Sequence, residues 1–170
     1  MLVYSQKGFT LIELITVIVI ISVLTAVAIP KLTALSKDSR IEVLEGIAGA
    51  IRSTTSMVRA KARVKGLSPA NSNPGGSTQT GFIVDFPFGS AEVDWRNLCP
   101  ESRAELGDNL TMLDFISFSG DDLQTQINNQ YTLIGYDIPN LSAPTNQGCY
   151  VIYDSFGDPN CTITVVTVDC

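Results

Sequence analysis

The residues of this chain with the clearest chemical potential lie near its N-terminal end. Glu13 is the one charged residue between Phe9 and Ile29, a stretch of 21 residues made mostly of large apolar side chains. A helix of that length would extend roughly 31 Å, enough to cross the hydrocarbon core of a bilayer. A carboxylate inside such a segment is costly unless it is paired, so we expect Glu13 to have a partner that serves a function.

The segment in front of the apolar run is unlike an ordinary secretory signal. Its single cation is Lys7, and the run is longer than the roughly 7–15 apolar residues of a signal core. No Ala-x-Ala-like cleavage site follows the run, whereas Gly8 stands directly before it. Gly8 is the one small residue here that suits a protease, and cleavage there would remove a leader of residues 1–8 and leave the apolar helix on the mature chain.

The sequence Gly8-Phe9-Thr10-Leu11-Ile12-Glu13 resembles the class III signal of type IV prepilins and the related pseudopilins. In that family a membrane peptidase cuts after the glycine, and the same enzyme N-methylates the new terminal phenylalanine. The resemblance implies that Phe9 is methylated. It also implies an assembly role for Glu13, the fifth residue of the mature chain, which would attract the N-terminus of a neighbouring subunit. Pro30 also lies where the family has its proline.

Later residues resemble the mannose-sensitive haemagglutinin branch of major pilins, namely Pro30-Lys31-Leu32, Arg40 to Gly46 and Cys149-Tyr150-Val151. The resemblance implies a structural subunit that polymerises head to tail into a helical surface filament for attachment and biofilm formation. It also implies two partners, a prepilin peptidase/methyltransferase and an assembly machinery in the inner membrane. The chain would be an inner-membrane prepilin first and part of an extracellular pilus later.

Two other functions fit the same signal. One is a pseudopilin of a type II secretion system, and the other is a minor pilin that acts as a tip adhesin and binds a surface carbohydrate. The aromatic residues Phe82, Phe86, Phe88 and Trp95 are more typical of a core than of a platform for sugars.

The sequence predicts an α+β fold with one long helix over residues 9–65. Pro30 removes a backbone donor inside that helix, so we expect a kink or local melting there. The helix comprises an apolar part, 9–29, and an amphipathic extension, 30–66, which Gly66 ends. The globular head is then 67–170. The extension carries an apolar stripe at steps of three or four residues, which should pack on an antiparallel sheet: Leu32, Leu35, Ile41, Leu44, Ile47, Ala48, Ile51 and Val58.

Within the head, alternation and turn residues predict several short elements. The last two strands should form a hairpin around Phe156–Asn160. Short helices are predicted at Pro100–Leu106 and Gly120–Ile127, and strands at Phe82–Phe86, Tyr131–Ile138, Cys149–Asp154 and Cys161–Val168.

Four cysteines in the second half of the chain indicate two disulfides, for which three pairings exist. In the predicted hairpin, Cys149 and Cys170 lie at the outer ends of the two strands, which favours Cys149–Cys170 together with Cys99–Cys161. The alternative, Cys161–Cys170 with Cys99–Cys149, requires the last strand to bend.

The composition argues against catalysis. The chain has no histidine, the commonest general base and metal ligand, and we expect neither an enzyme nor a cofactor. Asp154, Asp158 and Asn160 place oxygen atoms close together in the hairpin turn, as a calcium loop would, although a solvated turn explains them more simply.

Charge is divided unevenly along the chain. Residues 1–65 carry nine Lys/Arg and four Asp/Glu, whereas residues 66–170 carry two and thirteen. An acidic head argues against nucleic acid as a partner. The basic turn Lys61–Lys65 is either a solvated helix cap or a contact for the acidic head of a neighbouring subunit.

Overall fold

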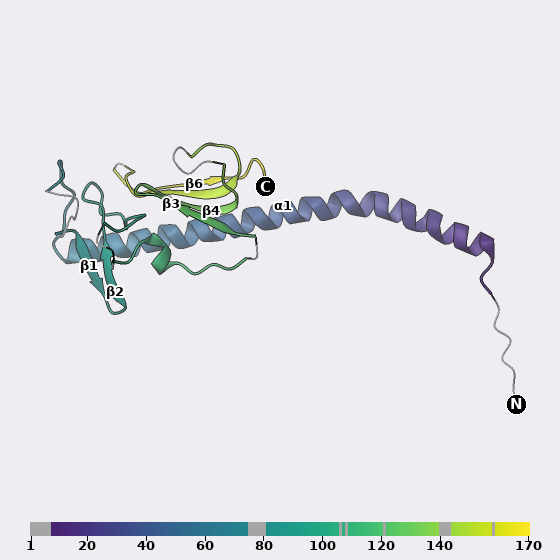
Figure 1. Cartoon of the computed structure of the whole chain (residues 1–170), viewed down its shortest axis with the longest axis horizontal. Coiled ribbons are helices and arrows are strands. Elements are labelled where there is room, and N and C mark those ends of the chain that lie inside the picture. The colour runs from purple at the N-terminus through teal and green to yellow at the C-terminus, as the bar shows by residue number, and fades with distance from the viewer. Residues whose placement is uncertain are drawn as a thin grey trace, which may run out of the picture. The chain divides into compact units, whose positions relative to one another are not determined.

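The computed structural model describes residues 8–74, 81–105, 107, 109–120, 122–139, 144–157 and 159–170. The chain divides into two units, Met1–Ser39 and Arg40–Cys170. Helix α1, Leu11–Val64, supplies residues to both, and every strand belongs to the second unit (Figure 1). The predicted α+β class is confirmed.

Helix α1 is assigned without interruption through Pro30. Local melting, one of the two outcomes predicted for this proline, is therefore not seen. The kink stays a prediction. The first seven residues of the expected leader, 1–7, lie outside the described residues.

The C-terminal end of α1 is closed by Gly66, as predicted. Gly66 has a φ of 89°, a left-handed conformation that costs glycine little. Its N–H donates to Arg63 O at 2.9 Å, and the Leu67 N–H donates to Ala62 O at 3.0 Å. This pair of bonds is the Schellman motif, which satisfies carbonyls that the end of a helix otherwise leaves free.

The main sheet of the second unit is antiparallel, with the strand order β3-β4-β5-β6. Strands β5 and β6 form the predicted hairpin, in which Tyr150 lies opposite Val166. The register between β4 and β5 shifts between Gly135 and Asp137, where the strands depart from regular pairing. The bounds are β3 Gln124–Ile127, β4 Tyr131–Asp137, β5 Cys149–Asp154 and β6 Thr162–Val166.

One face of this sheet packs on the second half of α1. Alternate residues of β5 point to opposite faces, as the strand period of two requires. Tyr153 belongs to the face that contacts the helix, whereas Tyr150 belongs to the other. The predicted apolar stripe is confirmed by five buried helix residues, Leu44, Ile47, Ala48, Ile51 and Val58. Ile41 is half-buried, and the side chains of Leu32 and Leu35 lie outside the described part of the chain.

A second, smaller core lies at the end of α1. The hairpin of β1, Ile83–Phe86, and β2, Gly89–Glu92, packs there around Val58 and Ala62. Phe86, Phe88 and Phe115 form an aromatic cluster with ring centres 5.0 to 5.6 Å apart. Phe86 is half-buried, as expected of a core residue, whereas the Phe88 side chain is 62% exposed.

The two disulfides are Cys99–Cys161 and Cys149–Cys170, so the favoured pairing is confirmed. The first attaches the loop after β2 to the β5–β6 hairpin. The buried Asn97 makes the same connection: its Nδ2 donates to Ser155 O at 2.8 Å and to Gly157 O at 2.6 Å. The loop is thereby held to the hairpin at two neighbouring places.

Both short helices predicted for the head are wrong. Pro100 forms an antiparallel bridge with Val93, and the Glu101 N–H donates to Glu92 O at 3.0 Å, so residues 100–105 run beside the end of β2 instead of coiling. Gln124–Ile127 is strand β3, which pairs with β4. The structure instead has one turn of 3-10 helix at Met112–Phe115, which the sequence did not predict.

Candidate assembly site

Thr10 and Glu13 form a closed hydrogen-bonded pair at the start of α1. Glu13 Oε2 accepts from the Thr10 N–H at 3.0 Å and from Thr10 Oγ1 at 2.8 Å, and the Glu13 N–H donates to Thr10 Oγ1 at 3.3 Å. This reciprocal arrangement is a capping box, which fixes where the helix begins. The capping role of Thr10 was not predicted, although Thr-x-x-Glu before an apolar run is the known sequence sign of such a cap.

The Glu13 carboxylate can therefore cap its own helix and also contact a second chain. In the subunit alone, its hydrogen bonds with described residues use Oε2 and leave Oε1 for another donor. A capping bond of this kind does not prevent an ion pair with an amine from a second chain. The geometry thus explains how a carboxylate can be held in place before a partner arrives.

The bond expected to be cleaved lies just outside the helix. Gly8, Phe9 and Thr10 have no regular secondary structure, and the Phe9 side chain is 84% exposed. A peptidase needs an extended, accessible peptide, and an exposed bond ahead of the helix suits that requirement.

Among the described residues, nothing packs on the first half of α1 or on Phe9 just before it. Their large apolar side chains are between 45% and 84% exposed, and those of the helix cover every face of it. An all-round apolar helix is one that becomes buried in a larger assembly or in lipid. The residues concerned are Phe9, Leu11, Ile12, Leu14, Ile15, Val17, Ile18, Val19, Ile20, Ile21, Val23, Leu24 and Ile29.

The hydroxyl groups of this segment are satisfied within the helix. Thr16 Oγ1 donates to Glu13 O at 2.9 Å, Ser22 Oγ to Val19 O at 2.7 Å, and Thr25 Oγ1 to Ile21 O at 2.9 Å. Because these donors already have acceptors, removing the segment from water leaves no unmet hydroxyl donor among them. The segment therefore suits an environment that excludes water.

Among the described residues, no helix combines the length and the mean hydropathy needed to cross a membrane.

A calcium loop is the less favoured interpretation of Asp154, Asp158 and Asn160. Asp154 Oδ1 accepts from the Phe156 N–H at 2.9 Å, and Asp154 Oδ2 accepts from Gln130 Nε2 at 3.2 Å. Both oxygens are thus engaged within the protein. Asp158 lies outside the described residues, and Asn160 is exposed. In the part of the chain that is described, no three acidic, cysteine or histidine side chains are grouped to hold a metal ion.

The N-terminal geometry agrees with a known family signature. Residues 4–29 match the prokaryotic N-terminal methylation motif. The match covers the expected cleavage position, the capping box and the exposed apolar helix together.

A similarity to a characterised protein points the same way. Over 78 residues the chain is 37% identical to the type IV narrow pilus major component PilA5 of Thermus thermophilus. The aligned part is 44% of this chain and spans 66% of that relative's length. No solved structure matches the chain. The motif and the similarity together show that this chain resembles type IV pilus components in part of its length.

Proposed function

We propose that this chain is the structural subunit of a type IV pilus. It is made as a prepilin in the inner membrane, cut after Gly8, methylated on Phe9 and polymerised into a filament for attachment and biofilm formation. The partners are a prepilin peptidase/methyltransferase and the assembly machinery of the inner membrane. The resemblance at Pro30 to Leu32 and Arg40 to Gly46 favours the mannose-sensitive haemagglutinin branch.

One observation carries this proposal. The first half of α1 exposes apolar side chains on every face, and the capped carboxylate of Glu13 stands at its start. Lipid would cover this surface in the prepilin, and copies of the same helix would cover it in the filament. The removal of this apolar area from water is the driving force expected for polymerisation.

Glu13 then sets the position of each new subunit. Its carboxylate pairs with the positive terminal amine of Phe9 in a neighbouring chain. N-methylation of that amine leaves its charge in place, so the ion pair survives the modification. The contact joins different surfaces of the two chains, which produces an open helical filament and not a closed ring.

Electron microscopy of cells with and without the chain tests the proposal. Cells that express the wild-type chain should carry thin surface fibres that antibody against the subunit decorates, and cells without it should lack them. A Gly8→Val variant should keep its leader and form no fibres. Fibres of unchanged abundance in cells without the chain would contradict the proposal.

The two rival functions give other results in the same experiment. A pseudopilin would leave the surface bare at native expression, and a tip adhesin would be labelled only at fibre ends. Label along the whole fibre is expected of the major subunit.

A further inference from the structure

Positive charge gathers at the C-terminal end of α1. Lys65 Nζ forms an ion pair with Asp85 Oδ2 at 2.9 Å, and Lys61 Nζ lies 4.2 Å from the ring centre of Phe86. Arg63 is exposed and forms no ion pair with any residue that the structure describes. We call Arg59, Lys61, Arg63 and Lys65 the basic end.

Arg59 and Arg63 are four residues apart, so their charges lie on the same helix face and repel one another. Arg59 is partly buried, and its Nε donates to Asn97 O at 3.1 Å. This burial, and next the charge of Arg63, lower the pKa of the Arg59 guanidinium. An anion placed beside the two arginines would relieve the repulsion.

Exposed apolar side chains accompany these cations. Val64 is 88% exposed, and Phe88, which stacks on Phe86 with ring centres 5.5 Å apart, is 62% exposed. Arginine and aromatic residues are enriched in protein–protein interfaces, where apolar contacts exclude water around the charges. The basic end thus has the composition of a contact surface and exceeds what a solvated helix cap requires.

The opposite end of the same unit is acidic. Asp137 pairs in register with Cys149, and the Asp169 N–H donates to Gly148 O at 3.1 Å, so both acids flank the Cys149–Cys170 disulfide. Asp122 lies nearby, around a pocket that Tyr136 also lines. We call Asp122, Asp137 and Asp169, which are all exposed, the acidic end.

The acidic end also carries an exposed apolar side chain. Val168, beside Asp169, is 63% exposed, which supplies an apolar contact here as well. One cation, Arg40, lines the same pocket as Asp122 and lies 5.1 Å from the ring centre of Tyr136. The three acids of the acidic end outnumber this cation.

The two ends cannot meet within one subunit. Arg40 marks the acidic end on α1 and Arg63 the basic end, and the helix between them is about 35 Å long. Figure 1 shows the β1–β2 hairpin beside the C-terminal end of α1, whereas the C-terminus of the chain lies beside an earlier part of that helix. Only a second chain can bring the opposite charges together.

We propose that the basic end of one subunit binds the acidic end of a second copy of this chain. The contact is heterologous, so it repeats without closing and runs along an open filament. It rests on the proposed function, and adds to it a contact between heads that is independent of Glu13. Residues 59–65 and the acids that flank the C-terminal disulfide are its two halves.

Charge reversal tests this contact in cells that express the full chain. Arg63→Glu alone and Asp137→Lys alone should each reduce the fibre protein recovered by shearing about tenfold, because each places like charges opposite one another. The double variant Arg63→Glu/Asp137→Lys should restore recovery to within about twofold of wild type, since the pair is re-formed with its signs exchanged.

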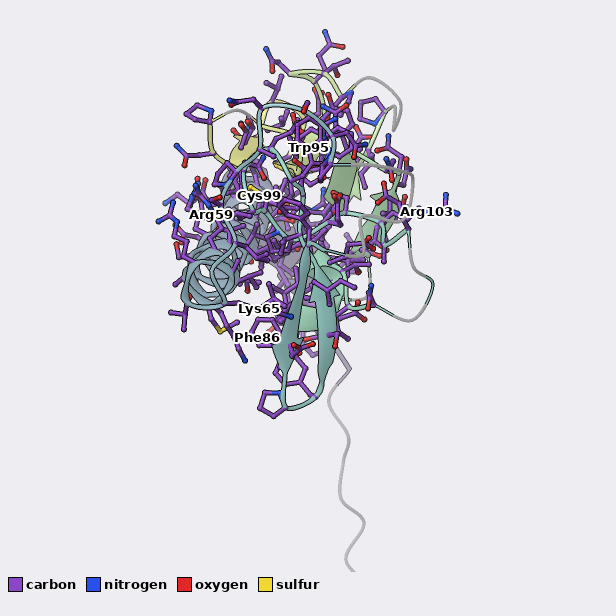
Figure 2. The ribbon with its side chains drawn as sticks, turned by 90° about the vertical axis from the view of Figure 1, so that its left-hand side faces the viewer. Arg59, Lys65, Phe86, Trp95, Cys99 and Arg103 are labelled. Atoms are coloured by element: carbon purple, nitrogen blue, oxygen red, sulfur yellow. A yellow bond between two sulfur atoms is a disulfide. The ribbon has the colours of Figure 1, made fainter. Side chains whose placement is uncertain are left out.

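Arg103→Glu is the matched control. Arg103 is also an exposed arginine, but Figure 2 shows it on the far side of the head from Arg59. This variant should yield wild-type amounts of fibre. All variants should reach wild-type levels in the membrane fraction, which verifies that they fold.

Two results would overturn the contact while leaving the proposed function intact. One is wild-type fibre recovery from Arg63→Glu, and the other is a double variant no better than the singles. If the basic end instead binds another acidic partner, such as an anionic polymer, the double variant should recover no more fibre than the single variants. Exchanging the charges within this chain cannot restore a contact with a different molecule. If the wild type itself forms no fibres, the proposed function fails first.

Discussion

At the scale of single residues, Glu13 combines a local role with a proposed role between chains. The capping box shows that its carboxylate is already used by Thr10 in the isolated subunit. A loss of assembly in a Glu13 variant alone would therefore not separate a weakened helix start from a lost contact between subunits. The two roles differ in their dependence on Thr10, which takes part only in the cap.

A pair of variants separates these roles. Glu13→Ala should be processed normally and lose most surface fibres, because it removes both the cap and the partner of the neighbouring amine. Thr10→Ala should remove only the cap, which lowers helix stability by about 1 kcal/mol, and most surface fibres should remain. Quantitative immunoblotting of sheared fibres measures both. Equal losses in the two variants would show that Glu13 acts only as a helix cap.

Glu101 is a second acid with an unusual setting. Its side chain is fully buried, and in its protonated form it shares a hydrogen bond with the Asp94 carboxylate. Burial, followed by the neighbouring charge of Asp94, raises its pKa from 4.5 to about 9. The folded head thus keeps this proton at neutral pH, where the unfolded chain has lost it.

The stability of the head should consequently fall as the pH rises from about 4.5 towards about 9. Between pH 5 and pH 8 the loss should be on the order of 4 kcal/mol. Glu101→Gln, which resembles the protonated acid, should flatten most of this dependence. Burial also raises the pKa of Asp94, so a smaller slope of the same sign should persist.

The fluorescence of the chain's single tryptophan, Trp95, reports the unfolding of the full-length subunit in detergent. Trp95 lies in the loop that Asn97 and Cys99 attach to the hairpin, so it should respond when the head unfolds (Figure 2). Stability that rises between pH 5 and pH 8 would contradict the assignment of the proton to Glu101.

At the scale of elements, local sequence patterns predicted the features that depend on interactions between residues close in the chain. The stripe at steps of three or four predicted the helix and its buried face. The strands rich in Val, Ile and Tyr, such as Cys149–Asp154, were predicted within a residue or two of their bounds. The favoured disulfide pairing was predicted correctly because the geometry of a hairpin limits which cysteines can lie close enough to bond.

The misses have one physical cause, which is long-range pairing. Gly89–Glu92 contains no residue that strongly favours a strand, yet it pairs with β1 because the chain turns back at Pro87 and Phe88. Residues 100–105 carried helix signals, but the pairing of Pro100 and Glu101 with β2 and its extension prevailed. The role of Asn97 depends on carbonyls of Ser155 and Gly157, far away in sequence, and no spacing reveals them.

Two glycines of α1 and its cap provide a matched test of the helix. Gly66→Ala should destabilise the subunit by about 1 kcal/mol, because its positive φ strains any other residue. Gly49→Ala should instead stabilise it by up to about 1 kcal/mol, since the position is helical and a Cβ there meets open space.

Denaturant unfolding in detergent, followed at Trp95, compares these two variants. The opposite signs are the decisive feature. If Gly66→Ala leaves the midpoint unchanged, the Schellman motif does not hold the end of the helix.

At the scale of the whole molecule, the two units of the chain carry different structural features. The first offers an apolar helix, whose described large side chains are exposed, and a carboxylate held at its start. The second is a disulfide-bonded α+β head that carries both the basic end and the acidic end. The methylation motif at residues 4–29 and the similarity to a pilus component agree with the proposed role as a filament subunit.

The most direct test of this account is the intact mass of the subunit in sheared surface fibres. We predict a chain that begins at Phe9, carries one added methyl group on its terminal amine and retains both disulfides. Fragmentation should place the methyl group on Phe9. A fibre subunit that still contains residues 1–8, or fibres that lack this chain altogether, would contradict the account.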